Sequence, residues 1–86
     1  MQDDDKILYE AVGRILRNNR KEKGFKFTIF CYENDIPKAT LYDIEHGNNQ
    51  AYFSKIYKIV KRLGMTFDEF GRKLEEELPK NFLDTE

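Results

Sequence analysis

The stretch IPKATLYDIEHG, residues 36–47, carries the start and stop signals of one short helix. Proline is favoured in the first turn of a helix and glycine just past its end, and Pro37 and Gly47 stand at those places. Leu41 and Ile44 are apolar and share one side, whereas the other faces are polar. We therefore predict a helix over residues 37–46 that turns most of its surface away from an apolar core.

Three longer helices are predicted from apolar residues at spacings of three and four, over residues 5–23, 54–63 and 67–78. We expect Ser54 to be the N-cap of the second of these. The third is preceded by Thr66 and Glu69, which have the spacing of a capping box.

The segment between the first helix and Pro37 is ambiguous, because Phe25, Phe27 and Ile29 alternate as they would in a strand. A lone strand would leave its backbone groups unmatched, and the sequence contains no second convincing strand. We therefore assign a short helix over residues 27–34 and expect tertiary context to override local propensity.

The 86 residues are expected to form one domain, residues 1–86, and the absence of a long apolar run predicts no membrane span. The acidic start MQDDDK is unlike a secretory signal, so we expect a cytoplasmic protein. One cysteine and one histidine offer no disulfide and no metal-ligand spacing, so we expect no metal and no cofactor. No nucleophile–base set or phosphate loop is visible, and we expect no enzymatic activity.

Charge is unevenly distributed along the chain. Between residues 13 and 63 there are eleven basic and five acidic residues, although the whole chain has a net charge of −1. A basic middle section is typical of a surface that meets an anion, and the alternative is ordinary solvated helix faces.

Two short helices that meet at a tight turn near residues 34–36 match a helix-turn-helix arrangement. The segments RKEKG (20–24), TLYDIEHG (40–47) and LGMTFDEF (63–70), in this order, resemble the lambda-repressor-like, Cro-type (XRE) family of bacterial and phage regulators, with small controller-type regulators similar in size. The resemblance implies an all-α, five-helix DNA-binding domain. Its helix-turn-helix, formed by the second and third helices, would span about residues 26–47.

In that family the second helix of the motif lies in the DNA major groove, with its first residues at base edges. The resemblance therefore implies base contacts from Lys38, Ala39, Tyr42 and Asp43. Lys38 can donate to guanine, Ala39 offers a methyl group to thymine, and Asp43 can accept from cytosine. The alternative is a surface helix whose polar residues are simply solvated.

The resemblance also implies contacts with the DNA backbone and one structural ion pair. Arg20 is expected to pair with Glu45 and to lock the reading helix against the first helix. The expected phosphate contacts come from Lys26, Thr40, Asn48, Asn49, Gln50 and Lys55.

The sequence departs from the family pattern at several positions. Phe27 stands where many members have a glutamine that anchors a phosphate. For Ile29 and Tyr32, which are apolar for an exposed face, we favour a larger local core. The alternative is a protein-partner surface made by Phe27, Ile29 and Tyr32.

Three further departures concern single residues. Asp35 replaces the usual turn glycine and is expected to tolerate left-handed geometry. Asn19 replaces a core leucine and is expected to form a local hydrogen bond. Cys31 is expected to be a small buried hydrophobe rather than a redox switch.

The function expected from these observations is sequence-specific regulation of transcription, for example as a repressor. A homodimer would bind a palindrome in double-stranded DNA, with Phe70, Leu74 and Leu78 as the expected dimer interface. The alternative for some of these residues, Phe70 first, is a place in the core beneath the fifth helix. The alternatives are an antitoxin that regulates its own gene through the same motif, and a protein-interaction module that has lost DNA binding.

Overall fold

Five helices make up the part of the chain that the computed structural model describes, which comprises residues 3–48 and 51–83. The helices are α1 (Asp3–Glu22), α2 (Phe27–Glu33), α3 (Lys38–Glu45), α4 (Phe53–Arg62) and α5 (Phe67–Glu77). No strand occurs within those ranges, so the helix predicted for residues 27–34 is confirmed. None of the five helices is long and apolar enough to cross a membrane.

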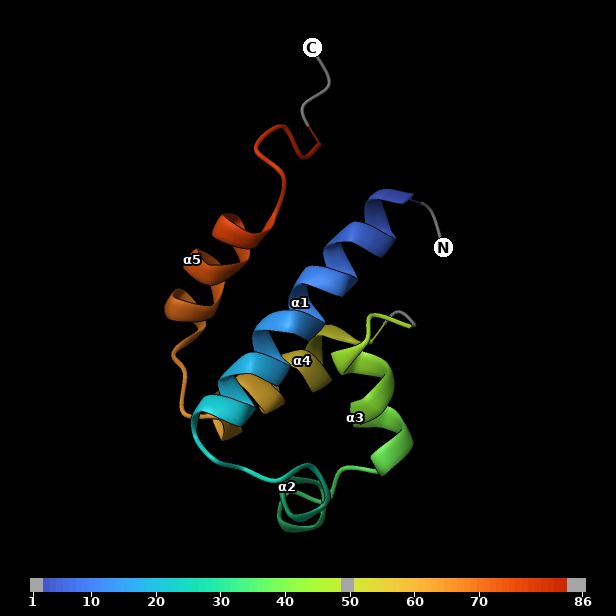
Figure 1. Ribbon diagram of the computed structural model, residues 1–86, viewed down its shortest axis with the longest axis vertical. Helices are drawn as coiled ribbons and strands as arrows, with labels where there is room; N and C mark the ends of the chain where they lie inside the picture. The colour runs from blue at the N-terminus through green and yellow to red at the C-terminus, as the bar shows by residue number, and fades with distance from the viewer. Residues whose placement is uncertain (1–2, 49–50, 84–86) are drawn as a thin grey trace.

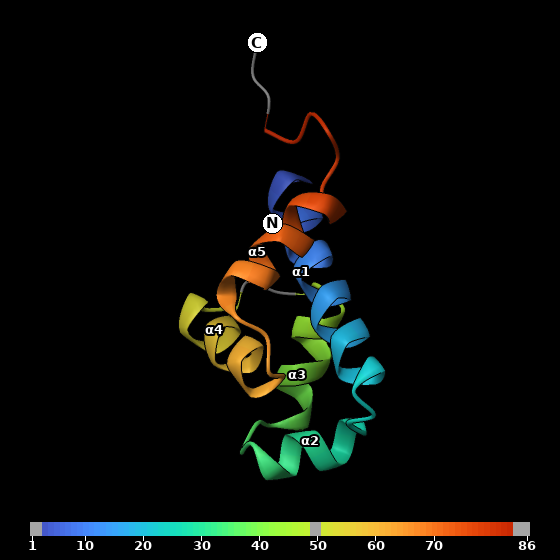
Figure 2. The same ribbon diagram turned by 90° about the vertical axis from the view of Figure 1, so that its left-hand side faces the viewer.

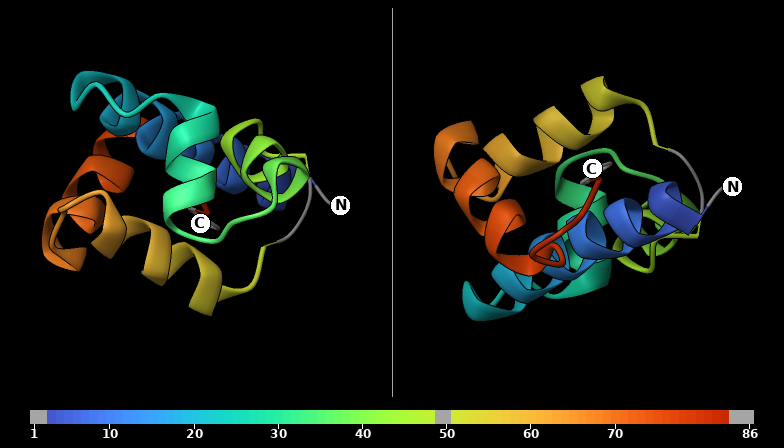
Figure 3. Two further views of the ribbon diagram at one scale, coloured as in Figure 1. Left: turned by 90° about the horizontal axis from the view of Figure 1, so that it is seen from below. Right: turned by 90° about the horizontal axis from the view of Figure 1, so that it is seen from above.

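Helix α1 runs through the middle of the domain, with α3 against one side and α5 against another (Figure 1). Helix α4 lies behind α1 in that view and contacts α5, while α2 crosses below and contacts α3. The pair α2 and α3 lies at the opposite end of the domain from the last turn of α5 (Figure 2). Seen from below, α2 and the turn that follows it lie next to α4 (Figure 3).

The core takes apolar side chains from all five helices. Leu16 of α1, Leu41 of α3 and Val60 of α4 are at most 1% exposed, and Leu63 after α4 is equally buried. The apolar stripes predicted for α1 and α4 are confirmed by this burial. The other apolar residues of the core cluster are Val12, Ile15, Phe30, Cys31, Ile44, Ile56, Ile59, Met65 and Phe70.

The starts of α4 and α5 differ in how they are capped. At α5 the Thr66 hydroxyl accepts from the Glu69 N–H at 3.1 Å, and the Glu69 carboxylate accepts from the Thr66 N–H at 3.0 Å, so the predicted capping box is confirmed. The prediction of Ser54 as the cap of α4 is wrong, because Tyr52 holds that position without a side-chain hydrogen bond. Inclusion of Phe53 in the helix packs its ring at a tilt against the rings of Tyr57 and Phe67, which favours the earlier start.

Two glycines allow α3 to lie directly against α1. A β-carbon on Gly13 would come within 2.5 Å of the main-chain oxygen of Ile44, so no larger residue fits between the two helices without a shift. Gly47 ends α3 with a φ of 64°, and a β-carbon there would come within 2.8 Å of the main chain of Glu10. The position of α3 is thus set by backbone contact with α1.

Candidate nucleic-acid interface

The turn between α2 and α3 is held by hydrogen bonds to the end of α2. The side-chain amide of Asn34 donates to the Phe30 carbonyl oxygen at 2.9 Å, and the main-chain N–H of Ile36 donates to the Cys31 carbonyl oxygen at 2.9 Å. Between them Asp35 has a φ of 55°, the left-handed geometry that aspartate tolerates better than most residues. The expectation for Asp35 is confirmed, and the turn fixes where α3 begins.

Helix α3 presents the predicted base-reading residues on one exposed face. Lys38, Ala39 and Tyr42 are exposed and Asp43 is half-buried. Residues at these spacings share one side of a helix, and the opposite side carries the buried residues of α3. The four side chains are therefore brought together next to the turn.

The predicted ion pair between Arg20 and Glu45 is present and buried. Arg20 Nε donates to Glu45 Oε2 at 2.7 Å, and its NH2 group donates to Oε1 at 3.2 Å. The remaining terminal nitrogen donates to the Phe25 carbonyl oxygen at 2.8 Å, and the guanidinium carbon lies 5.4 Å from the centre of the Phe27 ring. One arginine of α1 thereby holds α3, the α1–α2 loop and the start of α2.

Cys31 packs near this pair and behaves as a buried hydrophobe. Its side chain is in the core, with the residue 3% exposed. Burial raises the pKa of the Cys31 thiol, and the nearby Glu45 carboxylate raises it further, against smaller opposing effects of Arg20 and Lys38. A thiol kept neutral in this way is a poor nucleophile, in agreement with the expectation from sequence.

A stacked pair of rings at the end of α3 was missed by the sequence analysis. The rings of Tyr42 and His46 are stacked with centroids 4.0 Å apart. His46 Nδ1 lies 2.8 Å from the Tyr42 carbonyl oxygen, and since that oxygen can only accept, the proton of this bond is on Nδ1. The i, i+4 spacing of two rings was the signal that could have revealed the pair. The stack restrains the orientation of Tyr42 on the exposed face.

The predicted phosphate-binding residues are only partly brought together. Thr40 and Lys55 both line a groove of about 230 Å³ between α3 and α4. Lys26 is exposed at the N-cap of α2 and Asn48 is exposed after α3, and neither lines that groove. The predictions for Asn49 and Gln50 lie outside the described residues.

A larger groove of about 440 Å³ adjoins the first, between the α2–α3 turn and α4. Thr40 and Lys55 line it as well, together with Lys58 and Arg62. The sequence analysis named neither Lys58 nor Arg62 as a site residue, although their register with Lys55 places all three on one side of α4. The groove therefore has a basic wall beside the start of α3.

The outer face of α2 differs from the favoured expectation. Ile29 is 52% exposed and Tyr32 is 87% exposed, so the prediction of a larger local core is wrong for both. The core next to α2 is filled instead by Phe30 and Cys31 on its other side. Phe27 is half-buried and packs against the core.

The expected dimer-interface residues are mostly turned inward. Phe70 is 3% exposed and belongs to the core of its own chain, which removes its side chain from the surface. Leu74 is half-buried and packs against the same core, and Leu78 is half-buried at the C-cap of α5. The apolar stripe of α5 serves first to attach that helix to the domain.

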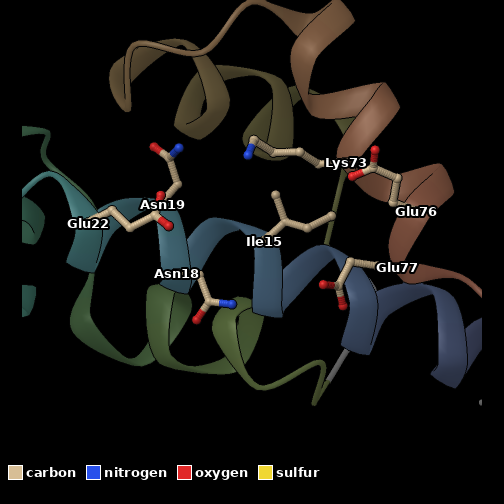
Figure 4. Close-up of a pocket in the computed structure, with 7 residues that line it drawn as sticks. All are labelled: Ile15, Asn18, Asn19, Glu22, Lys73, Glu76 and Glu77. Carbon is tan, nitrogen blue, oxygen red and sulfur yellow. The ribbon is translucent and has the colours of Figure 1, made fainter.

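A polar cleft of about 160 Å³ separates α1 from the end of α5, with Asn19 on one side and Lys73 and Glu77 on the other (Figure 4). Asn19 is buried, and its Oδ1 has no hydrogen-bond donor among the described residues, so the expected local bond is not made by this oxygen. The cleft is bridged at its edge by Arg14, whose Nε donates to Glu77 at 2.9 Å.

No group of three or more His, Cys, Asp or Glu side chains in residues 3–48 and 51–83 is arranged to hold a metal ion. Comparison of the chain with protein-family models, with curated proteins and with solved structures finds no match.

Proposed function

We propose that this chain is a sequence-specific DNA-binding regulator of transcription with a lambda-repressor-like fold, acting as a homodimer in the cytoplasm. Helices α2 and α3 would form its helix-turn-helix, and α3 would enter the major groove. The observation that carries the proposal is a short helix that exposes Lys38 and Tyr42 on one face and is held against the domain by its buried face.

Rigid attachment matters because base readout depends on side chains held at fixed positions relative to the base edges. Helix α3 is attached by backbone contact at Gly13 and by the two hydrogen bonds between Arg20 and Glu45. An ordinary solvated surface helix would need neither. The attachment leaves Lys38 and Tyr42 exposed to meet a ligand.

The charge around α3 suits a nucleic-acid backbone. Lys55, Lys58 and Arg62 line the groove next to the start of α3, and Thr40 adds a hydroxyl there. Phosphate contacts of this kind position a protein on a duplex, whereas base contacts supply sequence preference. The proposed division is therefore α4 and Thr40 for the backbone, and the exposed face of α3 for the bases.

Selection of bound duplexes from a random pool tests the proposal directly. The expected result is enrichment of a short palindrome, with affinity that falls steeply as salt increases. The selected duplex should then be titrated against a scrambled duplex of equal composition. Equal binding to both, or no binding to either, would overturn the proposed function.

A protein-interaction module is the second candidate, and the exposed Ile29 and Tyr32 on α2 favour it. The antitoxin alternative belongs here as well, because its partner would also need an exposed apolar surface. Replacement of Tyr32 with Ser should leave affinity for the selected duplex unchanged if α2 serves a protein partner. Loss of duplex binding in that variant would instead place Tyr32 in the DNA interface.

A further inference from the structure

Three aromatic rings are clustered on the outside of α4 and α5. The ring centroids of Phe53, Tyr57 and Phe67 are 5.2 to 6.2 Å apart in every pair. Phe53 is 67% exposed and Tyr57 is 42% exposed, whereas Phe67 is half-buried and rests on the core residue Phe70. Exposed aromatic rings gathered on one surface are a common mark of a binding site for another molecule.

Gly71 lies one turn after Phe67 on the same side of α5. A glycine inside a helix destabilises the fold by roughly 0.5–1 kcal/mol relative to alanine. No part of the described chain requires this glycine, because a β-carbon there would meet nothing within 4 Å. This contrasts with Gly13, where another helix fills the space. A missing side chain with open space around it suits close approach by a second molecule.

We propose that the surface formed by Phe53, Tyr57, Phe67 and Gly71, called the aromatic patch below, binds a second copy of this chain. The inference rests on the proposed function for its biological purpose, since it names the surface through which the homodimer forms. It moves the dimer interface from the inward-facing Phe70, Leu74 and Leu78 to exposed residues of α4 and α5. Burial of aromatic side chains against each other would supply most of the association energy.

The charges next to the aromatic patch favour a second copy over an unrelated partner. Three of the four basic residues of α4 line the groove assigned to the DNA backbone, which leaves Lys61 next to the aromatic patch, and α5 has five acidic residues and two basic ones. Lys61 follows Tyr57 by one turn, and Asp68 and Glu75 are exposed on α5. A two-fold axis that sets α4 of each copy against α5 of the other brings opposite charges together twice. The surface is thus complementary to itself, as a two-fold interface must be.

Sedimentation equilibrium of the chain without DNA tests the proposal over concentrations from about 1 μM to about 1 mM. The wild type should form dimers, and Phe53→Glu should weaken dimerisation by at least about tenfold, because it places a carboxylate next to the partner's acidic helix. Tyr32→Glu is the matched control, since it puts the same charge on another exposed aromatic position, on α2. It should leave dimerisation unchanged. Circular dichroism of each variant verifies that the helices are intact.

Gly71→Ala gives a second test with opposite effects on folding and on association. Alanine should raise the melting temperature of the dilute monomer, because it favours the helix. The same change should weaken dimerisation if the partner approaches closely at this position. A stabilised monomer with unchanged dimerisation would contradict the proposal.

Failure of this inference and failure of the proposed function give different results. A wild type that stays monomeric at the highest concentration, or dimers that withstand either Phe53→Glu or Gly71→Ala, would overturn the aromatic patch as the dimer surface whatever the chain does with DNA. Dimers that form through the patch but bind no selected duplex would support the patch and overturn only the DNA-binding function.

Discussion

A β-carbon on Gly13 would lie 2.5 Å from the main-chain carbonyl oxygen of Glu45, so α1 and α3 touch backbone to backbone at this residue. The side chain of the same Glu45 is held by Arg20 at 2.7 Å. Glu45 is therefore fixed through its main chain and its side chain by two residues of α1. The last turn of α3 is the anchored end, and the opposite end presents Lys38 and Ala39 to the surroundings.

Gly13→Ala should destabilise the fold, because the atoms that a methyl group would meet are backbone atoms that cannot rotate away. Overpacking of this kind reduces the free energy of unfolding by about 1–3 kcal/mol. Urea denaturation of the variant and the wild type measures the difference. Gly71→Ala is the matched control and should stabilise the dilute monomer, so a Gly13→Ala variant as stable as the wild type would contradict the close approach.

Arg20→Ala and Glu45→Ala should each lower the free energy of unfolding by about 3–5 kcal/mol, because either change leaves one charge buried without its partner. The double variant should be little worse than either single one, since it leaves no lone charge. Denaturation of all four proteins gives the coupling energy. Simple additivity would show that the two side chains do not act as a pair. The exposed pair of Arg14 and Glu77 is the control and should contribute less than about 1 kcal/mol.

Features encoded by local spacing were predictable from the sequence. The capping box needs only Thr66 and Glu69 three residues apart, and the apolar stripe of α4 follows from the helical period. The pairing of Arg20 with Glu45 is not local, and it was predicted only through the resemblance to a family. The left-handed geometry of Asp35 was likewise expected because the resemblance places a turn glycine there, and aspartate tolerates that geometry.

Features that depend on how helices cross could not be predicted. Gly13 carries no sequence signal, because its role appears only when α3 packs against it. The same spacing of apolar residues on α2 or α5 fits a buried face or an exposed one. Tyr32 was therefore expected to be more buried than it is, and Phe70 to be more exposed than it is. The aromatic patch joins α4 to α5, and no single-helix pattern indicates that Phe53 and Phe67 meet.

Glu69→Gln should reduce the acid sensitivity of the fold. Hydrogen bonds from the main-chain N–H and the hydroxyl of Thr66 lower the pKa of Glu69 below its usual 4.5. A lowered folded-state pKa stabilises the protein above about pH 4.5, and this stabilisation is lost as the pH falls through the folded-state value. Urea midpoints measured on either side of that range should therefore change less in Glu69→Gln than in the wild type. Glu75→Gln, further along α5, is the control that keeps the capping box. An equal change of the urea midpoint with pH in both variants would argue against a role for the cap.

Lys38→Ala and Tyr42→Ala should separate reading from folding, because both side chains are exposed and neither is part of the core cluster. Their melting temperatures should stay close to that of the wild type.

If Lys38 contacts a base, its loss should weaken binding by about 1–3 kcal/mol at one operator position and relax the preference there. Competition titrations with duplexes changed at single positions measure this effect. Lys21→Ala removes an exposed lysine that belongs to α1 rather than to α3, and it should leave the preference intact. A uniform loss across all duplexes, with a shallower salt dependence, would instead assign Lys38 to the phosphate backbone.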